Sequence, residues 1–473
     1  MEEEPLLEKQ YRPRVATWEA FKEELKMTCS LALPMVIMTV SQYMSRFVSM
    51  MMVGHLGELA LSGCSVATAL TNVLGFSLVC GMSSGLETLC GQAFGAKQYH
   101  KLGIYTYGAT ISVLVACIPV CILWIFLEDV LIFLGQDPMI SREAGRFAIW
   151  LIPALFPYAI IQPLTRYLQM QSLIIVMVLC SVAALIFQIP VCWIFVFKFE
   201  LGTAGAALSI GLSYWVNVIL LVLYVKYSSA CEKTRITFSS DVFPTIPKFM
   251  KLAIPSALML CLEWWIFEVM VLLSGLLSNP QLETSVLSIC LLICSVHYFL
   301  PFSVGTAASI RVSNELGAGN PERARMIVVA VIFLAVAETT ISVILLFCFR
   351  HILGFAFSDS DEVVNYLSHL MPFICLLLLT DCFQAVLSGV ARGSGWQHIG
   401  AYINFGSYYI VALPVAATLG FGIHLGGTGL WLGLNAGSAV QSTLLSLITG
   451  FTDWRKQASM AKERVLAGGT LSL

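Results

Sequence analysis

The chain has 473 residues, of which 58% are hydrophobic and only 11% are charged, and its formal net charge is −2. Soluble domains carry about 25% charged residues, so a soluble core could not hide this many apolar side chains behind so few charges. The composition therefore excludes a soluble enzyme and predicts an all-α, multi-pass membrane protein. Because there is neither a basic face nor a phosphate-binding loop, we expect no nucleic-acid partner.

Polar turns divide the chain into apolar segments of about 20 residues or more, the length that crosses a bilayer. In chain order, we expect twelve spans, at residues 29–53, 64–87, 104–127, 147–166, 173–197, 204–227, 251–277, 284–307, 326–349, 364–390, 400–421 and 427–451. Lys and Arg gather in both tails and in the connections that follow even-numbered spans, which places both termini in the cytoplasm. Arg46 is an exception, because it lies within the first span.

Similar Gly- and Pro-containing motifs occur in the same order in the two halves of the chain. The matched pairs are "LALPM" around Pro34 with "LAIPS" around Pro255, "FGAK" (94–97) with "LGAG" (316–319), Pro190 with Pro414, and "LGTAG" (201–205) with "LGGTG" (425–429). Gly and Pro also recur by chance in apolar helices, but the constant order favours an internal repeat. Many secondary transporters have this plan, with the substrate handled between the halves.

The repeat predicts two six-helix lobes related by a pseudo-twofold axis along the membrane normal. We expect a cytoplasmic tail at 1–28, an N-lobe at 29–227, a cytoplasmic linker at 228–248, a C-lobe at 249–451 and a cytoplasmic tail at 452–473.

Two carboxylates of the second half occupy positions at which the first half carries glutamine. Glu263, in "CLEWWIFEVM", aligns with Gln42, and Asp381 aligns with Gln162. A charge at the bilayer centre costs about 2.5–3.5 kcal/mol even on lenient scales, so such residues have a function by default. Burial disfavours the charged form of a carboxyl group, which can then take up a proton from one side and release it to the other. We therefore predict that Glu263 and Asp381 form a coupled proton site.

Glu268 is a third candidate for proton coupling. It lies about 140° around the helix from Glu263, so both can point straight into one cavity only where the helix bends. Pro255 can bend this helix, because proline removes a hydrogen bond, and Pro34 is the matching hinge candidate in the first span. A structural ion pair or hydrogen bond is the alternative role for each of the acids.

The predicted substrate cavity is lined by Gln42, Gln162, Trp264 and Trp265. The two tryptophans can stack on a flat or cationic substrate, and packing between helices is the alternative. His and Cys are scattered rather than clustered, so we expect no metal site.

Five motifs identify a family that the chain resembles. They are "ETLCGQAFGAKQ" (87–98), "RYLQMQ" (166–171), "CLEWWIFE" (261–268), "RVSNELGAGNP" (311–321) and "GVARGSGWQ" (389–397). In sequence and spacing they resemble the eukaryotic MATE (multidrug and toxic compound extrusion) transporters, and most closely the plant detoxification branch.

The resemblance implies twelve helices in two lobes around a central V-shaped cavity, and export of organic cations, xenobiotics or secondary metabolites in exchange for H⁺ or Na⁺. It implies coupling to H⁺ rather than Na⁺ through Glu263, Glu268 and Asp381, and no organic cofactor. Asp381 departs from the Glu of animal members. Gln42 stands in the helix in which well-known bacterial branches keep an essential Asp, which puts a cation site in the first half in doubt.

Two other functions are the alternatives to export. A lipid-linked oligosaccharide flippase shares the twofold plan but should line its cavity with many cationic residues, and an integral membrane transferase needs paired aspartates or a His/Asn pair.

We expect small cationic or amphipathic organic substrates, a lipid bilayer environment and a monomer. The segment "EEEPLL" (2–7) fits an acidic dileucine signal for the vacuole, or else an acidic tail, so the plasma membrane and the vacuolar membrane both remain open.

Overall fold

The computed structural model describes residues 18–357 and 360–466, and within these ranges every regular element is a helix. The segment 2–7 lies outside the described residues. The first half contains α1 (Trp18–Gly54), α2 (Glu58–Thr71), α3 (Ser77–Ser83), α4 (Gly85–Gly95), α5 (Tyr99–Ile125), α6 (Leu127–Phe133), α7 (Pro138–Met170), α8 (Ile174–Trp193) and α9 (Gly202–Tyr227). The second half contains α10 (Ile246–Ser274), α11 (Pro280–Gly317), α12 (Pro321–Cys348), α13 (Arg350–Leu353), α14 (Asp361–Ser394), α15 (Gln397–Asn404), α16 (Leu413–Ala417), α17 (Gly426–Gly450) and α18 (Trp454–Leu466).

Eleven helices of the described chain are long and apolar enough to cross a membrane. The expected twelfth span, 427–451, coincides with α17, which is not among the eleven. With 25 residues, α17 is about 37 Å long, which exceeds the hydrocarbon thickness of about 30 Å. It is less apolar because it carries buried polar residues, among them Asn435, Ser438 and Gln441, that bond to neighbouring helices.

The tails and the linker contain more helix than the sequence indicated. Helix α1 begins at Trp18, within the expected N-terminal tail, and α10 begins at Ile246, within the expected linker. Most of the C-terminal tail forms α18, which packs against α4, α11 and α12. The polar turns between helices are short. Residues 96–98 alone separate α4 from α5, and residues 318–320 alone separate α11 from α12.

The turns of the two halves repeat the same backbone conformation. Positive φ angles occur at Lys97 (59°) and Gly319 (77°), at Glu200 (53°) and His424 (61°), and at Gly202 (57°) and Gly426 (58°). These pairs fall in or beside the matched "FGAK"/"LGAG" and "LGTAG"/"LGGTG" motifs. A π-helical segment also begins four residues after each matched proline, at Ile194–Lys198 after Pro190 and at Thr418–Gly422 after Pro414. The internal repeat therefore extends to local backbone geometry.

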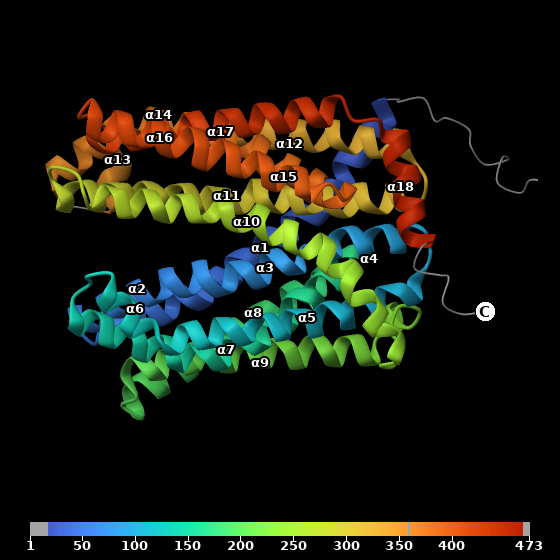
Figure 1. Cartoon of the computed structure of the whole chain (residues 1–473), viewed down its shortest axis with the longest axis horizontal. Coiled ribbons are helices and arrows are strands. Elements are labelled where there is room, and N and C mark those ends of the chain that lie inside the picture. The colour runs from blue at the N-terminus through green and yellow to red at the C-terminus, as the bar shows by residue number, and fades with distance from the viewer. Residues whose placement is uncertain (1–17, 358–359, 467–473) are drawn as a thin grey trace, which may run out of the picture.

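Two groups of helices lie beside each other, α2–α9 in one and α11, α12 and α14–α17 in the other (Figure 1). Helix α10 starts in the first group, where Phe249, Ala253 and Ala257 join its apolar core, and ends in the second, where Ile266 and Met270 are buried. Pro255 lies just before this crossing.

Helix α1 crosses in the opposite sense. Its Ala32 packs in a core with residues of α11, α12 and α14, whereas Met35, Met38 and Val53 belong to the core of the first group. Pro34 lies at the change. Each half therefore begins with a helix that is packed partly on the other half and that carries a proline near the crossing point.

A buried charge cluster fixes the start of α1 against the second group. Glu24 is fully buried, and its carboxylate accepts a hydrogen bond from Nη2 of Arg311 at 2.8 Å and one from Nη2 of Arg323 at 2.9 Å. We expect Glu24→Gln to destabilise the protein by about 3 kcal/mol, because it leaves Arg311 with less compensating charge in a buried site. The exposed pair of Glu19 with Lys22 on the same helix provides the control, and Glu19→Gln should cost less than about 1 kcal/mol.

The measurement is the thermal unfolding midpoint of the purified protein in detergent. Equal midpoints for the Glu24 and Glu19 variants would show that the buried cluster does not hold α1.

Candidate functional site

A cavity of about 370 Å³ lies between the two groups of helices. Its first wall comes from α1, α3, α7 and the π-helical segment Asn72–Phe76, and its second wall comes from α10, α11, α14 and the π-helical segment Phe405–Ala412. The polar side chains of the first wall are Gln42, Tyr43, Arg46, Asn72, Ser77, Tyr158, Gln162, Thr165, Arg166 and Gln169, and those of the second wall include Glu263, Glu268, Tyr298, Asp381, Gln384 and Tyr408. The volume falls in the range that holds a drug-sized ligand.

The cavity brings together the acids that the sequence singled out. Glu263 is 3% exposed and accepts a hydrogen bond from the Tyr298 hydroxyl at 2.7 Å. Asp381 is 7% exposed and accepts one from the Ser438 hydroxyl at 2.6 Å. In the described part of the chain, neither carboxylate has a Lys, Arg or His ion-pair partner, so both are held by neutral donors.

Glu268 also lines the cavity, although it lies well around the helix from Glu263. Trp264 and Phe267 line the cavity as well, so the cavity borders a broad face of α10 and both acids reach it without facing in the same direction.

Of the four other residues predicted to line the cavity, three do so and the fourth packs between helices. Gln42, Gln162 and Trp264 line the cavity. Trp265 does not, because its Nε1 donates to the Val73 carbonyl at 2.9 Å and so links α10 to the first group. The two tryptophans therefore take the two alternative roles, one facing the cavity and one packing between helices.

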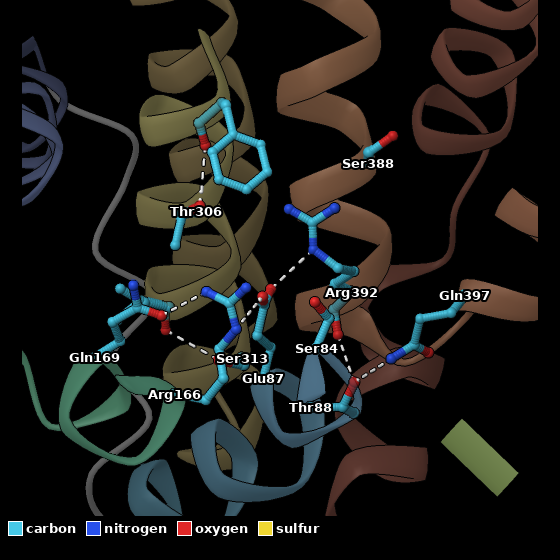
Figure 2. A network of polar contacts seen from close by, with 12 residues as sticks. Ser84, Glu87, Thr88, Arg166, Gln169, Thr306, Ser313, Ser388, Arg392 and Gln397 are labelled. Atoms are coloured by element: carbon cyan, nitrogen blue, oxygen red, sulfur yellow. Dashed lines mark hydrogen bonds and ion pairs between the residues drawn. The ribbon is translucent and has the colours of Figure 1, made fainter. Parts of the chain in front are cut away.

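A buried ion-pair network joins the two halves at the end of the molecule that carries α18 and the start of α1 (Figures 1 and 2). The Glu87 carboxylate on α4 accepts a hydrogen bond from Nε of Arg392 on α14 at 2.9 Å and forms an ion pair with Nε of Arg166 on α7 at 3.3 Å. Arg166 also donates to Gln169 at 2.8 Å. Because all three charged side chains are less than 8% exposed, this network bonds the two halves to each other away from water.

Neighbouring contacts extend the closure. Gln92 of α4 donates to the Gly393 carbonyl at 3.2 Å, and Gln397 donates to the Thr88 hydroxyl at 2.6 Å. Arg464 of α18 donates to the Ser394 carbonyl at 3.0 Å, so the C-terminal helix covers the same junction. Glu87, Arg166 and Arg392 each stand in one of the five sequence motifs, but the sequence did not show that they meet.

Several partners of the site were missed from the sequence. Tyr298 and Ser438 lie on α11 and α17 and carry no motif that ties them to Glu263 or Asp381. His297 and Glu338, which had no assigned role, form a pair at 3.3 Å between α11 and α12. Arg46 could have been singled out, since a lone charge within an apolar span is a signal by itself.

The sequence model of the MatE family matches residues 34–194 and again 255–418, once in each half. The chain belongs to the MatE family. MATE proteins are transporters, so this chain is a membrane transporter and not an enzyme. The earlier resemblance is thereby confirmed.

Individual MATE relatives match over nearly their full length. The chain is 51% identical over 470 residues to Protein DETOXIFICATION 3 of Arabidopsis thaliana, covering 99% of each chain. The structure is similar to the crystal structure of the eukaryotic MATE transporter AtDTX14, with a TM-score of 0.91 and 50% identity over 94% of this chain and 100% of that one. An outward-facing multidrug resistance MATE transporter of the MOP superfamily shares the fold, with a TM-score of 0.80 at 17% identity over 95% and 99% of the two chains.

The closed end depends on two glycines at which α4 and α11 approach each other. A Cβ at Gly95 would overlap the Asn314 carbonyl, and one at Gly317 would overlap the Gln92 carbonyl. We expect Gly95→Ala to separate these helices at a cost of about 1–3 kcal/mol. Amide hydrogen exchange should then become faster in residues 85–98 and 311–320. Gly450→Ala is the control, because a Cβ there meets no atom within 4 Å. Unchanged exchange in the Gly95 variant would contradict this account of the closure.

Proposed function

We propose that the protein is a proton-coupled antiporter that exports organic cations, xenobiotics or secondary metabolites from the cytoplasm. The observation that carries the proposal is the contrast between two kinds of buried carboxylate. Glu87 is neutralised by two arginines, whereas Glu263 and Asp381 face a ligand-sized cavity, accept hydrogen bonds from hydroxyls and form no ion pair with any described residue.

Hydroxyl partners suit a group that changes its protonation state. A hydroxyl donates to a carboxylate and can also accept from a protonated carboxyl group, so Tyr298 and Ser438 can serve both states of the acids. An arginine partner would instead hold the carboxylate ionised. Glu268 supplies a third carboxylate on the same cavity.

A proton and an organic cation then compete for the same acids. Ionised carboxylates attract the organic cation from the cytoplasm. Protonation of these carboxylates from the outer side removes their charge and releases the cation. The free energy for export is the difference in proton affinity between the two states, and no contact supplies more than that. We favour H⁺ over Na⁺, because a hydroxyl partner can bond to either protonation state of the acid.

The proposed architecture is twelve spans in two six-helix lobes around a V-shaped cavity, with both termini cytoplasmic. Support comes from the repeated turns, the two family matches and the length of α17. On this orientation, the Glu87 network is a closed cytoplasmic gate and the cavity opens outward. Pro34 and Pro255 are the proposed hinges, since each lies where its helix passes between the halves.

We further propose a monomer in the plasma membrane or the vacuolar membrane. The flippase alternative finds little support, because the described lining contains three carboxylates and only two arginines, one of them neutralised by Glu87.

Proton coupling is tested in proteoliposomes loaded with a fluorescent organic cation under an imposed pH gradient or Na⁺ gradient. We expect the wild type to follow the pH gradient alone. Glu263→Gln and Asp381→Asn should each lower gradient-driven transport at least tenfold, since the introduced amide cannot take up or release a proton at that position of the site.

The matched control is Glu283→Gln. Glu283 also accepts from a tyrosine hydroxyl, that of Tyr366 at 2.8 Å, but it does not line the cavity. We expect this variant to keep pH-driven transport. If both cavity variants still follow the pH gradient at the wild-type rate, the acids are structural. Transport that follows Na⁺ instead would exclude a proton antiporter.

A further inference from the structure

The first wall of the cavity contains a cation that its neighbours do not neutralise. Arg46 on α1 lines the cavity among apolar helices. Its Nη1 donates to the Asn72 side-chain oxygen at 2.9 Å, and its Nε reaches the Tyr214 hydroxyl at 3.4 Å. No Asp or Glu among the described residues forms an ion pair with it, in contrast to Arg166, Arg311, Arg323 and Arg392.

Two aromatic rings hold the guanidinium in place. Its central carbon lies 4.8 Å from the centroid of Phe76 and 5.9 Å from that of Tyr158. The rings pack edge to face with their centroids 4.9 Å apart, so they form a fixed platform. Cation–π contacts compensate part of the lost hydration but add no negative charge.

Arg46 keeps hydrogen-bonding capacity for a ligand. A guanidinium has five N–H donors in a planar fork, which matches a carboxylate or another oxyanion in bidentate geometry. The hydrogen bonds of Arg46 to Asn72 and Tyr214 use Nη1 and Nε, which leaves part of that fork free. A charged group that lies in a low-dielectric site without a counter-charge favours the binding of a ligand group of opposite charge.

The opposite wall carries the opposite charge. Glu263, Glu268 and Asp381 face the same cavity from α10 and α14. A ligand that fills the cavity therefore meets carboxylates on one side and a guanidinium on an aromatic platform on the other. This is the complement of a molecule with a cationic group at one end and an anionic group at the other.

We propose that Arg46, with Asn72 and the faces of Phe76 and Tyr158, is a subsite for the anionic group of amphoteric organic substrates, such as an aromatic carboxylate that also carries a cationic nitrogen. This inference rests on the proposed function, because it takes the cavity to be the substrate site. It adds the residues that recognise the anionic group of such a substrate.

The test uses two fluorescent ligands that differ in one charge: rhodamine B, a cationic dye with a free carboxylate, and its methyl ester. Binding of each dye to the purified protein is measured by fluorescence polarisation without a pH gradient, so that the result does not depend on coupling. We expect the wild type to bind both dyes. Arg46→Gln should weaken rhodamine B about tenfold or more, the usual effect of losing a charge-assisted hydrogen bond, and should change the ester less than twofold.

Two further variants show what the side chain does. Arg46→Lys keeps the charge but loses the planar fork, so we expect an intermediate loss for rhodamine B. Arg350→Gln is the control, because Arg350 also stacks on an aromatic ring, 4.2 Å from the centroid of Phe347, but lies outside the cavity. We expect this control variant to bind both dyes with the affinity of the wild type.

The outcomes separate this subsite from the proposed function. If Arg46→Gln weakens both dyes equally or changes neither, Arg46 supports the fold and the anion subsite is wrong. If the wild type binds only the ester, the cation site stands and the anion subsite is excluded. If it binds neither dye, the cavity is not an organic-cation site, which contradicts the proposed function itself.

Discussion

The buried ion pairs of Glu87 with Arg166 and Arg392 are the constraint on which the arrangement of the two halves depends. They join α4, α7 and α14 at one end, where the glycine contacts between α4 and α11 allow close approach. Each charge is out of water, so separating the halves at this end would expose or orphan charges that now compensate each other. The cavity lies between halves that this network joins at one end, while α1 and α10 each pack on both of them.

The same kind of side chain has two uses in this molecule, and the difference lies in its partners. Glu24 and Glu87 are each bound by two arginines and act as fixed anions. Glu263 and Asp381 are bound by hydroxyls, which accommodate both protonation states. Proton coupling in our proposal depends on this difference rather than on burial, because all four groups are buried.

The sequence predicted the helical membrane fold and the family because both depend on local features. Long apolar runs predict spans, and motifs of Gly, Pro and charged residues predict turns at which the backbone takes positive φ. The prediction that Glu263 and Asp381 act together rested on the repeat, because both are carboxylates within apolar spans at positions where the first half carries glutamine.

Contacts between distant segments could not be predicted in this way. Glu24 was assigned to a tail because it lies before the apolar run, yet two arginines about 290 residues away compensate its burial. Tyr298 and Ser438 look like ordinary helix residues, and only tertiary packing brings them to the acids. Helix α18 is polar in sequence and is ordered by the junction that it covers, through Arg464. Trp264 and Trp265 are adjacent in sequence and identical in type, so only the direction of each side chain decides which one faces the cavity.

The central claim is that a proton and an organic cation compete for the same carboxylates. Isothermal titration of the purified protein with an organic cation, repeated in buffers of different ionisation enthalpy, measures this directly. The account predicts that the observed heat depends on the buffer, because cation binding displaces protons from the acids, and that this dependence disappears when Glu263 and Asp381 are both replaced by their amides. Binding heat that is the same in every buffer for the wild type would show that no proton is exchanged, and would contradict the account.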